Sequence, residues 1–243
     1  GSGFIGRKRY LNQLRRSFSK QQHVVLHGLG GMGKTTLAEA FAHNYDNRSH
    51  EVIIFRNGPQ ISEKFILDEL FARLEADENA NKNTARQIKQ YLESDADPQE
   101  KLQALVVNYL QPRKTILIFD NFEDVQQSEG GEQECNIGSA GLAAFLQHLC
   151  KNAPDNCHLL FTTRYVIGDL KAAVLHLALD KMSYAESYRL SNFSDVLRTI
   201  PLAERQDVFK RLDGHPRAYE FLEAILKNDP TTNWSGLAAS VGQ

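Results

Sequence analysis

A glycine-rich segment at residues 28–35 has the spacing of a phosphate-binding loop. It reads Gly-Leu-Gly-Gly-Met-Gly-Lys-Thr and satisfies the pattern G-x-x-x-x-G-K-[ST]. The glycines let the backbone turn its N–H groups inward, Lys34 can reach the β- and γ-phosphates of ATP, and the Thr35 hydroxyl can bind Mg²⁺. We expect the phosphate cradle to consist of Gly28, Gly30, Gly31, Met32, Gly33, Lys34, Thr35 and Thr36.

The context of this segment favours a functional loop over a plain glycine-rich turn. The apolar run 23–27 (HVVLH) precedes it, and a helical pattern at 36–43 follows. A strand, a turn and a helix in this order put the positive end of the helix beside the bound phosphates. We therefore predict an adenine-nucleotide site here.

Acidic residues follow a second apolar run, at 115–119 (TILIF). Asp120 stands directly after it. Ligands of open α/β sheets bind at the carboxyl ends of the strands, so Asp120 is placed to hold Mg²⁺, commonly through a water molecule. Asn121 cannot act as a base, which makes Glu123 the candidate for orienting or deprotonating the attacking water. A solvated loop carboxylate is an equal alternative for Glu123.

Two further residues are candidates on position. Arg164 follows the run 158–162 (HLLFT) and Thr163, where a guanidinium could contact the γ-phosphate; the alternative is a solvated arginine. Pro216 stands in Gly-His-Pro between two helical patterns and could press on an adenine. A helix-start proline is its commoner role, and chemistry alone favours that role.

Strand and helix patterns alternate up to about residue 180. The runs at 23–27, 52–55, 115–119, 158–162 and 174–179 are almost continuously apolar, as in strands covered on both faces of a parallel sheet. Helical spacing recurs between them at 66–74, 102–110 and 142–149. Polar segments 76–98 and 126–138 are expected to be loops. After residue 180, segments 183–190, 193–199, 202–212 and 216–227 predict helices, so we expect an α/β domain at 4–180 and a small helical domain at 181–243.

Composition argues against several other classes, although it leaves a local basic patch possible. The net charge of −2 supplies no global basic field for nucleic acid or for an anionic membrane, and no apolar run approaches the length of a membrane span. Three cysteines without a CxxC pair argue against a disulfide scaffold, and a reducing cytoplasm fits them best. Residues 1–3 have the appearance of a cloning scar.

The ordered set of motifs resembles the NB-ARC branch of the STAND ATPases, signal-transducing relatives of AAA+ proteins. The segments that carry the resemblance are FIGR at 4–7, GLGGMGKTTLA at 28–38, VIIF at 52–55, ILIFDNFEDV at 116–125, LLFTTR at 159–164 and LDGHPRAYEFL at 212–222. The resemblance implies an ASCE-type P-loop NTPase with a three-layer parallel sheet, in which the strand before Arg164 lies between the phosphate-loop strand and the Asp120 strand.

The resemblance also implies roles for individual residues. Ile5, Gly6 and Arg7 would line the adenine and ribose, Arg164 would sense the γ-phosphate, and Pro216 would pack on the base. It implies a switch that ADP holds closed and that ATP opens to self-association, with a winged-helix domain and repeat domains outside this fragment.

Two other functions stay open. A AAA+ motor or DNA-remodelling ATPase would carry an arginine finger, for which the sequence offers no candidate. A nucleotide-binding scaffold without hydrolysis would account for Asn121 in place of a second acid.

Overall fold

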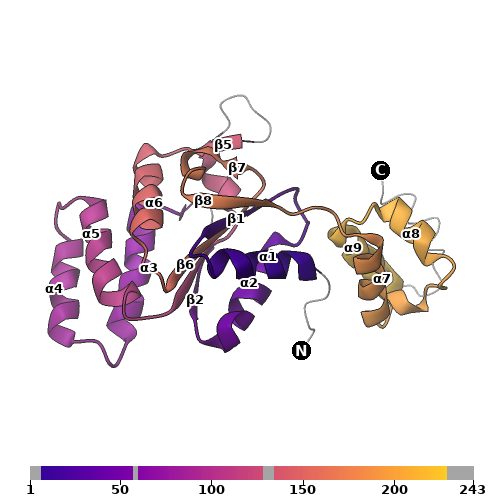
Figure 1. Ribbon diagram of the computed structural model, residues 1–243, viewed down its shortest axis with the longest axis horizontal. Helices are drawn as coiled ribbons and strands as arrows, with labels where there is room; N and C mark the ends of the chain where they lie inside the picture. The colour runs from indigo at the N-terminus through magenta and orange to yellow at the C-terminus, as the bar shows by residue number, and fades with distance from the viewer. Residues whose placement is uncertain (1–6, 57–59, 128–133, 229–243) are drawn as a thin grey trace.

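Five parallel strands form the central sheet. The computed structural model describes residues 7–56, 60–127 and 134–228. The strand order is β2-β3-β6-β1-β8, with every neighbouring pair parallel (Figure 1). The strands are β1 (His23–His27), β2 (Glu51–Phe55), β3 (Thr115–Phe119), β6 (Cys157–Thr163) and β8 (Val174–Ala178). The predicted location of β6, between the phosphate-loop strand and the Asp120 strand, is confirmed.

Helices cover both faces of this sheet. Ile53, Leu117 and Leu159 belong to one apolar core, whereas Ile116 and Leu160 belong to another. Successive side chains of a strand point to opposite faces, which explains why the strands are apolar at nearly every position. The first core contains α3 (Glu63–Ala76), α5 (Pro98–Leu105) and α6 (Ala140–Asn152), and the second contains α1 (Lys8–Phe18) and α2 (Lys34–Asn44). The predicted three-layer P-loop fold is confirmed.

The register of three strands brings the polar ends of β3 and β6 together. Phe55, Phe119 and Phe161 are register partners, and their rings stack with centroids 4.7 Å apart in each neighbouring pair. Such aromatic pairs contribute about 0.5–1.5 kcal/mol each beyond the burial of their area. The next residues, Asp120 directly after β3 and Thr162 within β6, therefore lie side by side at the carboxyl edge of the sheet.

The prediction of a loop at 76–98 is wrong over much of its length. Helix α4 (Lys82–Leu92) forms there, and the Asn81 side chain caps it by accepting hydrogen bonds from the backbone N–H groups of Asn83 and Thr84. Ile88 is the buried residue of α4. Because α4 buries so narrow a stripe, its sequence lacks the apolar period by which the other helices could be predicted.

Two other segment predictions need correction. Part of the predicted loop 126–138 is strand: β4 (Gln126–Gln127) pairs antiparallel with β5 (Glu134–Ile137), which pairs in parallel with β7 (Val166–Ile167). Cys135 and Ile137 are buried in β5 and alternate with polar residues, a period-two signal that was present in the sequence. In the predicted helix 193–199, a short 3₁₀ turn at Leu197–Thr199 forms instead.

Helix α1 has no counterpart among the predicted elements. It buries Tyr10, Leu14 and Phe18 against the second core, and these residues recur at helical spacing. The helix begins after Arg7, whose backbone is left-handed with φ of 56°.

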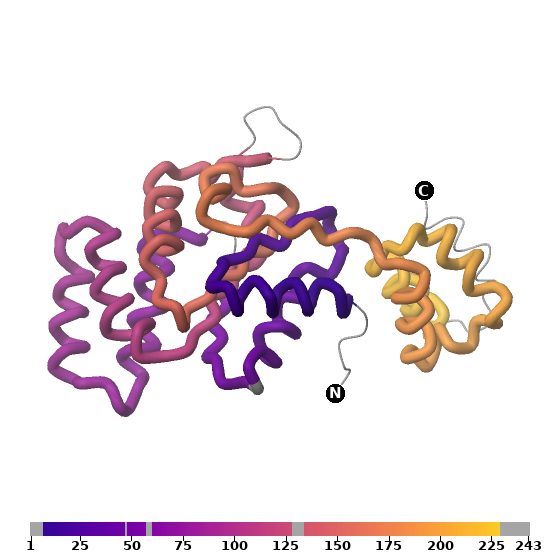
Figure 2. The backbone as a smooth tube through the Cα atoms, in the orientation of Figure 1, coloured from indigo at the N-terminus to yellow at the C-terminus, as the bar shows by residue number. Residues whose placement is uncertain are grey.

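The last three helices form a group with its own core. We call α7 (Tyr184–Phe193), α8 (Arg205–Leu212) and α9 (Pro216–Asn228) the helical unit, which an extended segment after β8 connects to the sheet (Figures 1 and 2). Its apolar cluster includes Met182, Val208 and Leu222. Gly214, two residues after the end of α8, has φ of 64°, and Pro216 opens α9 in the role of a helix-start proline. No helix within the described ranges is both long and apolar enough to cross a membrane.

Histidines are buried at the opposite, amino-terminal edge of the sheet. His23 Nδ1 accepts a hydrogen bond from the backbone N–H of Leu159, and its Nε2 lies 3.0 Å from the carbonyl oxygen of Cys150. That pairing requires the neutral imidazole with its proton on Nε2. His158 stacks on Phe18 with ring centroids 4.3 Å apart, and burial lowers the pKa of His158 to about 4, helped by the neighbouring His50 and His23.

From the burial of His158, we predict that the folded protein loses stability in mild acid. The unfolded chain binds a proton at His158 below pH of about 6.5, whereas the folded chain does not until about pH 4, so the free energy of unfolding falls across this window. His158 alone should account for up to about 3 kcal/mol. Urea unfolding at several pH values should show a shallower pH dependence in His158→Phe than in the wild type.

The matched control is His43→Gln, which alters an exposed histidine on α2. Its pH profile should follow that of the wild type. Parallel profiles for His158→Phe and the wild type would contradict the role of His158.

Candidate functional site

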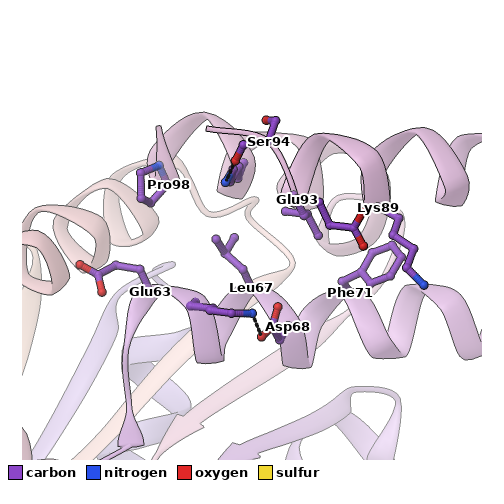
Figure 3. A pocket seen from close by; sticks show the side chains of 11 residues that line it. Glu63, Leu67, Asp68, Phe71, Lys89, Glu93, Ser94 and Pro98 are labelled. Atoms are coloured by element: carbon purple, nitrogen blue, oxygen red, sulfur yellow. Dashed lines mark hydrogen bonds and ion pairs between the residues drawn. The ribbon is translucent and has the colours of Figure 1, made fainter. Parts of the chain in front are cut away.

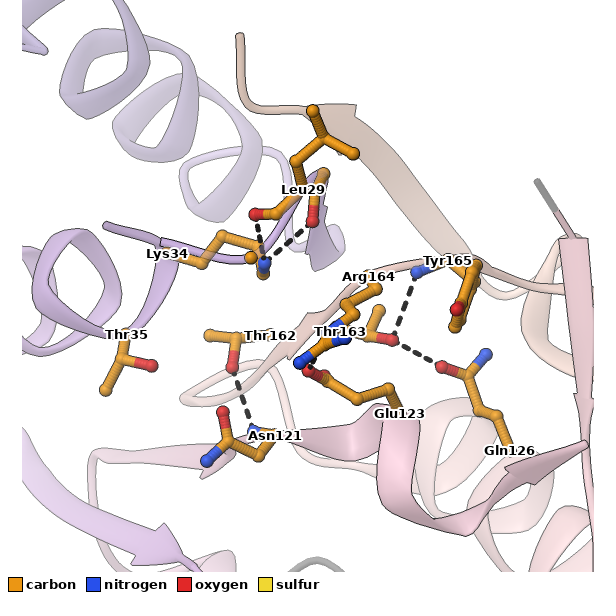
Figure 4. Close-up of polar contacts among 12 residues, drawn as sticks. Leu29, Lys34, Thr35, Asn121, Glu123, Gln126, Thr162, Thr163, Arg164 and Tyr165 are labelled. Carbon is orange, nitrogen blue, oxygen red and sulfur yellow. Dashed lines mark hydrogen bonds and ion pairs between the residues drawn. The ribbon is translucent and has the colours of Figure 1, made fainter. Parts of the chain in front are cut away.

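The loop from Gly28 to Thr35 joins β1 to the first turn of α2. Gly28, Gly31 and Gly33 have φ of 148°, 73° and 82°, conformations that disfavour a side chain. The Lys34 amine donates hydrogen bonds to the carbonyl oxygens of Gly28, at 2.7 Å, and of Leu29, at 2.9 Å (Figure 4). Burial lowers the pKa of Lys34. The lysine thus lies inside the loop at the positive end of α2, where anionic phosphates are stabilised.

Two of these glycines also admit neighbouring segments to the loop. A Cβ on Gly28 would lie 2.7 Å from the carbonyl oxygen of Leu179, in the segment after β8. A Cβ on Gly31 would lie 2.8 Å from the His215 ring and 3.0 Å from the Cβ of Arg217. By contrast, a Cβ on Gly33 would have no such atom within 4 Å. The loop is therefore both a phosphate cradle by shape and the surface on which the helical unit rests.

Asp120 and Thr35 meet across the site. The Thr35 hydroxyl donates a hydrogen bond of 2.7 Å to Asp120 Oδ1, and Asp120 is only 4% exposed. A hydroxyl and a carboxylate are the hard oxygen ligands that Mg²⁺ prefers, so this pair fits the predicted metal site. Thr36, the other predicted hydroxyl, is exposed in the first turn of α2.

Arg164 and Glu123 are paired with each other. Arg164 Nε donates to Glu123 Oε1 at 3.0 Å, and Glu123 Oε2 is buried without a hydrogen-bond partner among the described residues (Figure 4). The Arg164 guanidinium is largely exposed and lies 3.9 Å from the place that a Cβ on Gly30 would occupy. The candidate sensor and the candidate base therefore lie together beside the loop.

The helical unit contributes two residues that sequence reasoning missed. His215 Nε2 lies 3.1 Å from the carbonyl oxygen of Gly30, and Arg217 packs over Gly31. Both flank Pro216, the residue singled out in the sequence. A polar signal was therefore present on either side of it, but contact with the loop depends on how the helical unit packs.

Arg7 connects three parts of the chain. Its guanidinium donates to the carbonyl oxygens of Asp180, at 2.5 Å, Lys181, at 3.3 Å, and Met32, at 3.3 Å. Its backbone N–H donates to Glu186 Oε1 at 2.9 Å. Arg7 is buried, and this desolvation lowers its pKa. Its side chain thus ties the loop to the segment that leads into the helical unit.

Part of the predicted base-binding set cannot be compared with this geometry. Ile5 and Gly6 lie outside the described residues. The contact of Arg7 with adenine or ribose stays a prediction, although its guanidinium is bonded to backbone carbonyls. The same holds for Pro216 and the base.

A separate cavity of about 740 Å³ lies among α3, α4 and α5 (Figure 3). Leu67 and Phe71 supply part of its apolar lining, and an ion pair of 2.6 Å joins Lys64 to Asp68 at its rim. None of its lining residues belongs to the predicted nucleotide site. The chemistry inferred from the sequence is therefore concentrated at the phosphate loop rather than in this cavity.

Comparison with known proteins agrees with this fold. The AAA ATPase domain family matches residues 3–162, so the chain belongs to the AAA ATPase domain family. An uncharacterized WD repeat-containing protein of Nostoc sp. strain PCC 7120 is 28% identical over 173 residues, which are 66% of this chain and 12% of that protein.

Solved structures extend the likeness of the fold to the helical unit. A STAND protein with a tetratricopeptide repeat sensor from Pyrococcus horikoshii has a TM-score of 0.61 at 19% identity, over 90% of this chain and 29% of that chain. A RuvB variant of Thermotoga maritima has a TM-score of 0.57 at 16% identity, over 98% of this chain and 69% of that chain. The predicted STAND-type P-loop resemblance is thereby confirmed at the level of the AAA ATPase domain and the fold.

Gly31 and Gly33 have similar backbone conformations, but we predict different effects when a methyl group is added at each position. Gly31→Ala should push His215 and Arg217 away from the loop, whereas Gly33→Ala has only its backbone strain to accommodate. Hydrogen–deuterium exchange of residues 179–183 and 214–217 should become faster in Gly31→Ala and change less in Gly33→Ala. Equal exchange of these segments in both variants would contradict the proposed contact between the loop and the helical unit.

Proposed function

We propose that this chain is an ATP- and ADP-binding switch module of a larger STAND regulator or defence protein, with slow ATP hydrolysis that controls self-association. The observation that carries the proposal is the meeting of Lys34, Thr35 and Asp120 at a loop on which His215 and Arg217 of the helical unit rest. A nucleotide bound there would touch both parts of the chain. The division proposed is a nucleotide-binding domain at 4–180 and a helical domain at 181–243.

The proposed binding roles follow from charge and position. Lys34 neutralises the β- and γ-phosphates, and Thr35 with Asp120 holds Mg²⁺, which would offset phosphate charge. Arg164 donates charge-assisted hydrogen bonds to the γ-phosphate, and Arg217 can add a second guanidinium from the helical side. Ile5, Gly6, Arg7 and Pro216 would hold the adenosine.

Glu123 is the proposed base for hydrolysis. Its Oε1 is engaged by Arg164 at 3.0 Å, so the carboxylate must share Arg164 with any γ-phosphate. Asn121 supplies no second acid beside Asp120. Both features support slow turnover that times a signal, rather than fast turnover.

A AAA+ remodelling or DNA-associated ATPase is the second candidate. The similarity of the chain's fold to that of RuvB favours this class. So does Arg217, the arginine of the helical unit that packs over Gly31 of the loop. Phosphate release that accelerates steeply with protein concentration would support this class, because a neighbouring subunit would then complete the site. A scaffold that binds ATP without hydrolysis would release no phosphate at any concentration.

The chain spans 12% of the WD repeat relative and 29% of the STAND structure, so functions of whole proteins enter only as proposals. We propose that further domains, including a winged helix and repeats, complete the regulator in the cytoplasm. Light scattering of the longer protein with ATP and with ADP would test ATP-dependent self-association.

The proposal predicts that Lys34→Ala weakens ATP binding. The variant removes the cation that faces the phosphates and should raise the Kd for Mg²⁺·ATP at least about tenfold, the typical value of a hydrogen bond to a charged group. Isothermal titration of both proteins measures this change. Lys64→Ala, which alters an exposed lysine on α3, is the control and should bind as the wild type does. Unchanged affinity in Lys34→Ala would sink the nucleotide-site assignment.

Arg164 predicts a difference between ATP and ADP. Because ADP lacks the γ-phosphate, Arg164→Ala should weaken ATP binding by roughly 1–3 kcal/mol and ADP binding by less. Pro216→Ala provides the comparison, since a contact with the base would affect both nucleotides alike. The test measures four dissociation constants, those of each variant for ATP and for ADP, and compares them with the wild-type values. Equal losses for ATP and ADP in Arg164→Ala would show that Arg164 is no γ-phosphate sensor.

A further inference from the structure

Strand β6 ends in two buried hydroxyls that were not among the predicted site residues. The side chains of Thr162 and Thr163 are fully buried. A buried hydroxyl costs stability unless it is hydrogen-bonded. The Thr163 hydroxyl donates a hydrogen bond to Gln126 Oε1, whereas the Thr162 hydroxyl donates one to Asp120 Oδ1. The two neighbours therefore serve different partners.

The two hydrogen bonds of Thr162 Oγ1 show where its hydroxyl proton points. The backbone N–H of Asn121 donates to Thr162 Oγ1 at 3.1 Å, and an N–H group can only donate. The hydroxyl proton is thus left for Asp120 Oδ1, 2.5 Å away. Thr162 accepts from the backbone that follows Asp120 and donates to the Asp120 side chain, which restrains the carboxylate from two sides.

The same oxygen of Asp120 receives both threonines. Thr35 donates to Oδ1 from α2, and Thr162 donates to Oδ1 from β6. Oδ2 accepts no hydrogen bond from any residue in the described part of the chain. Thr35 is itself a proposed metal ligand. Thr162, which also donates to Asp120, has no proposed contact with metal or nucleotide.

We infer that Thr162 is a positioning residue for Asp120: its hydroxyl holds Oδ1 and leaves Oδ2 for Mg²⁺ or its bound water. Thr162 then sets the affinity for the magnesium form of the nucleotide without touching either ligand. The inference rests on the proposed function, because it concerns how the proposed metal site is held. Outer-shell partners of this kind typically change metal affinity or activity 10- to 100-fold when they are removed.

The experiment compares ATP binding with excess Mg²⁺ and with EDTA by isothermal titration. Thr162→Val keeps the shape and β-branching of threonine but cannot donate a hydrogen bond. It should reduce the gain in affinity that Mg²⁺ gives by about 10- to 100-fold, with little change in EDTA. Thr162→Ser, which restores the hydroxyl, should recover most of the gain. A hydroxyl needed only for folding would lower the melting temperature and leave this ratio unchanged.

Thr163→Val is the matched control, because Thr163 is equally buried and adjacent but serves Gln126. It should keep the Mg²⁺-dependent gain of the wild type. A full gain in Thr162→Val, or an equal loss in Thr163→Val, would overturn the inference while leaving the nucleotide site intact. A wild type that binds no ATP in either buffer would instead remove the proposed function. If Thr162→Val does not fold, Thr162→Ala applies the same test with a smaller side chain that also lacks the hydroxyl.

Discussion

The parallel pairing of β3 with β6 in one register controls the chemistry at the edge of the sheet. Stacked phenylalanines at the register positions Phe119 and Phe161 stabilise it, and the next residues are then Asp120 and Thr162. A shift of one residue would turn every side chain of a strand to the other face. The buried faces of both strands resist such a shift, because it would carry each core's residues into the other layer. The hydrogen bond between Thr162 and Asp120 thus depends on apolar packing one position earlier in the chain.

Close approach to the phosphate loop is the second constraint. Backbone atoms of Leu179 and side chains of His215 and Arg217 come so near that Gly28 and Gly31 have no room for a Cβ. The loop's glycines therefore satisfy two demands, a backbone conformation that can enclose phosphate and contact with the helical unit. A ligand in the loop would lie on the same small surface that the helical unit contacts. The proposed nucleotide-dependent switch would draw on this geometry, since an equilibrium shifts only when a ligand interacts differently with two arrangements.

Two cationic side chains, Lys34 in the loop and Arg164 beside it, have hydrogen-bond partners that a phosphate could replace. Lys34 is bonded to carbonyl oxygens of the loop, and Arg164 is paired with Glu123. A highly charged phosphate would compete for both. In the proposed function, the pairing of Arg164 with Glu123 would link sensing of the γ-phosphate to the freedom of the proposed base. The proposed slow hydrolysis and the proposed sensing would then share one ion pair.

The sequence by itself determined the strands of the sheet and the phosphate loop, because a buried parallel strand must be apolar on both faces and a phosphate loop needs glycine at fixed spacing. It also indicated that Asp120 and Arg164 end strands at one edge. It did not reveal α4, whose single buried residue leaves little periodicity, or β5, whose four residues were read as loop. Only the tertiary structure decided that Thr162 holds Asp120, that His215 reaches Gly30 and that Arg7 bonds the carbonyl oxygens of the loop and of the segment after β8. These contacts join residues far apart in the chain, and their geometry follows from strand register and domain packing, which no local pattern of residues encodes.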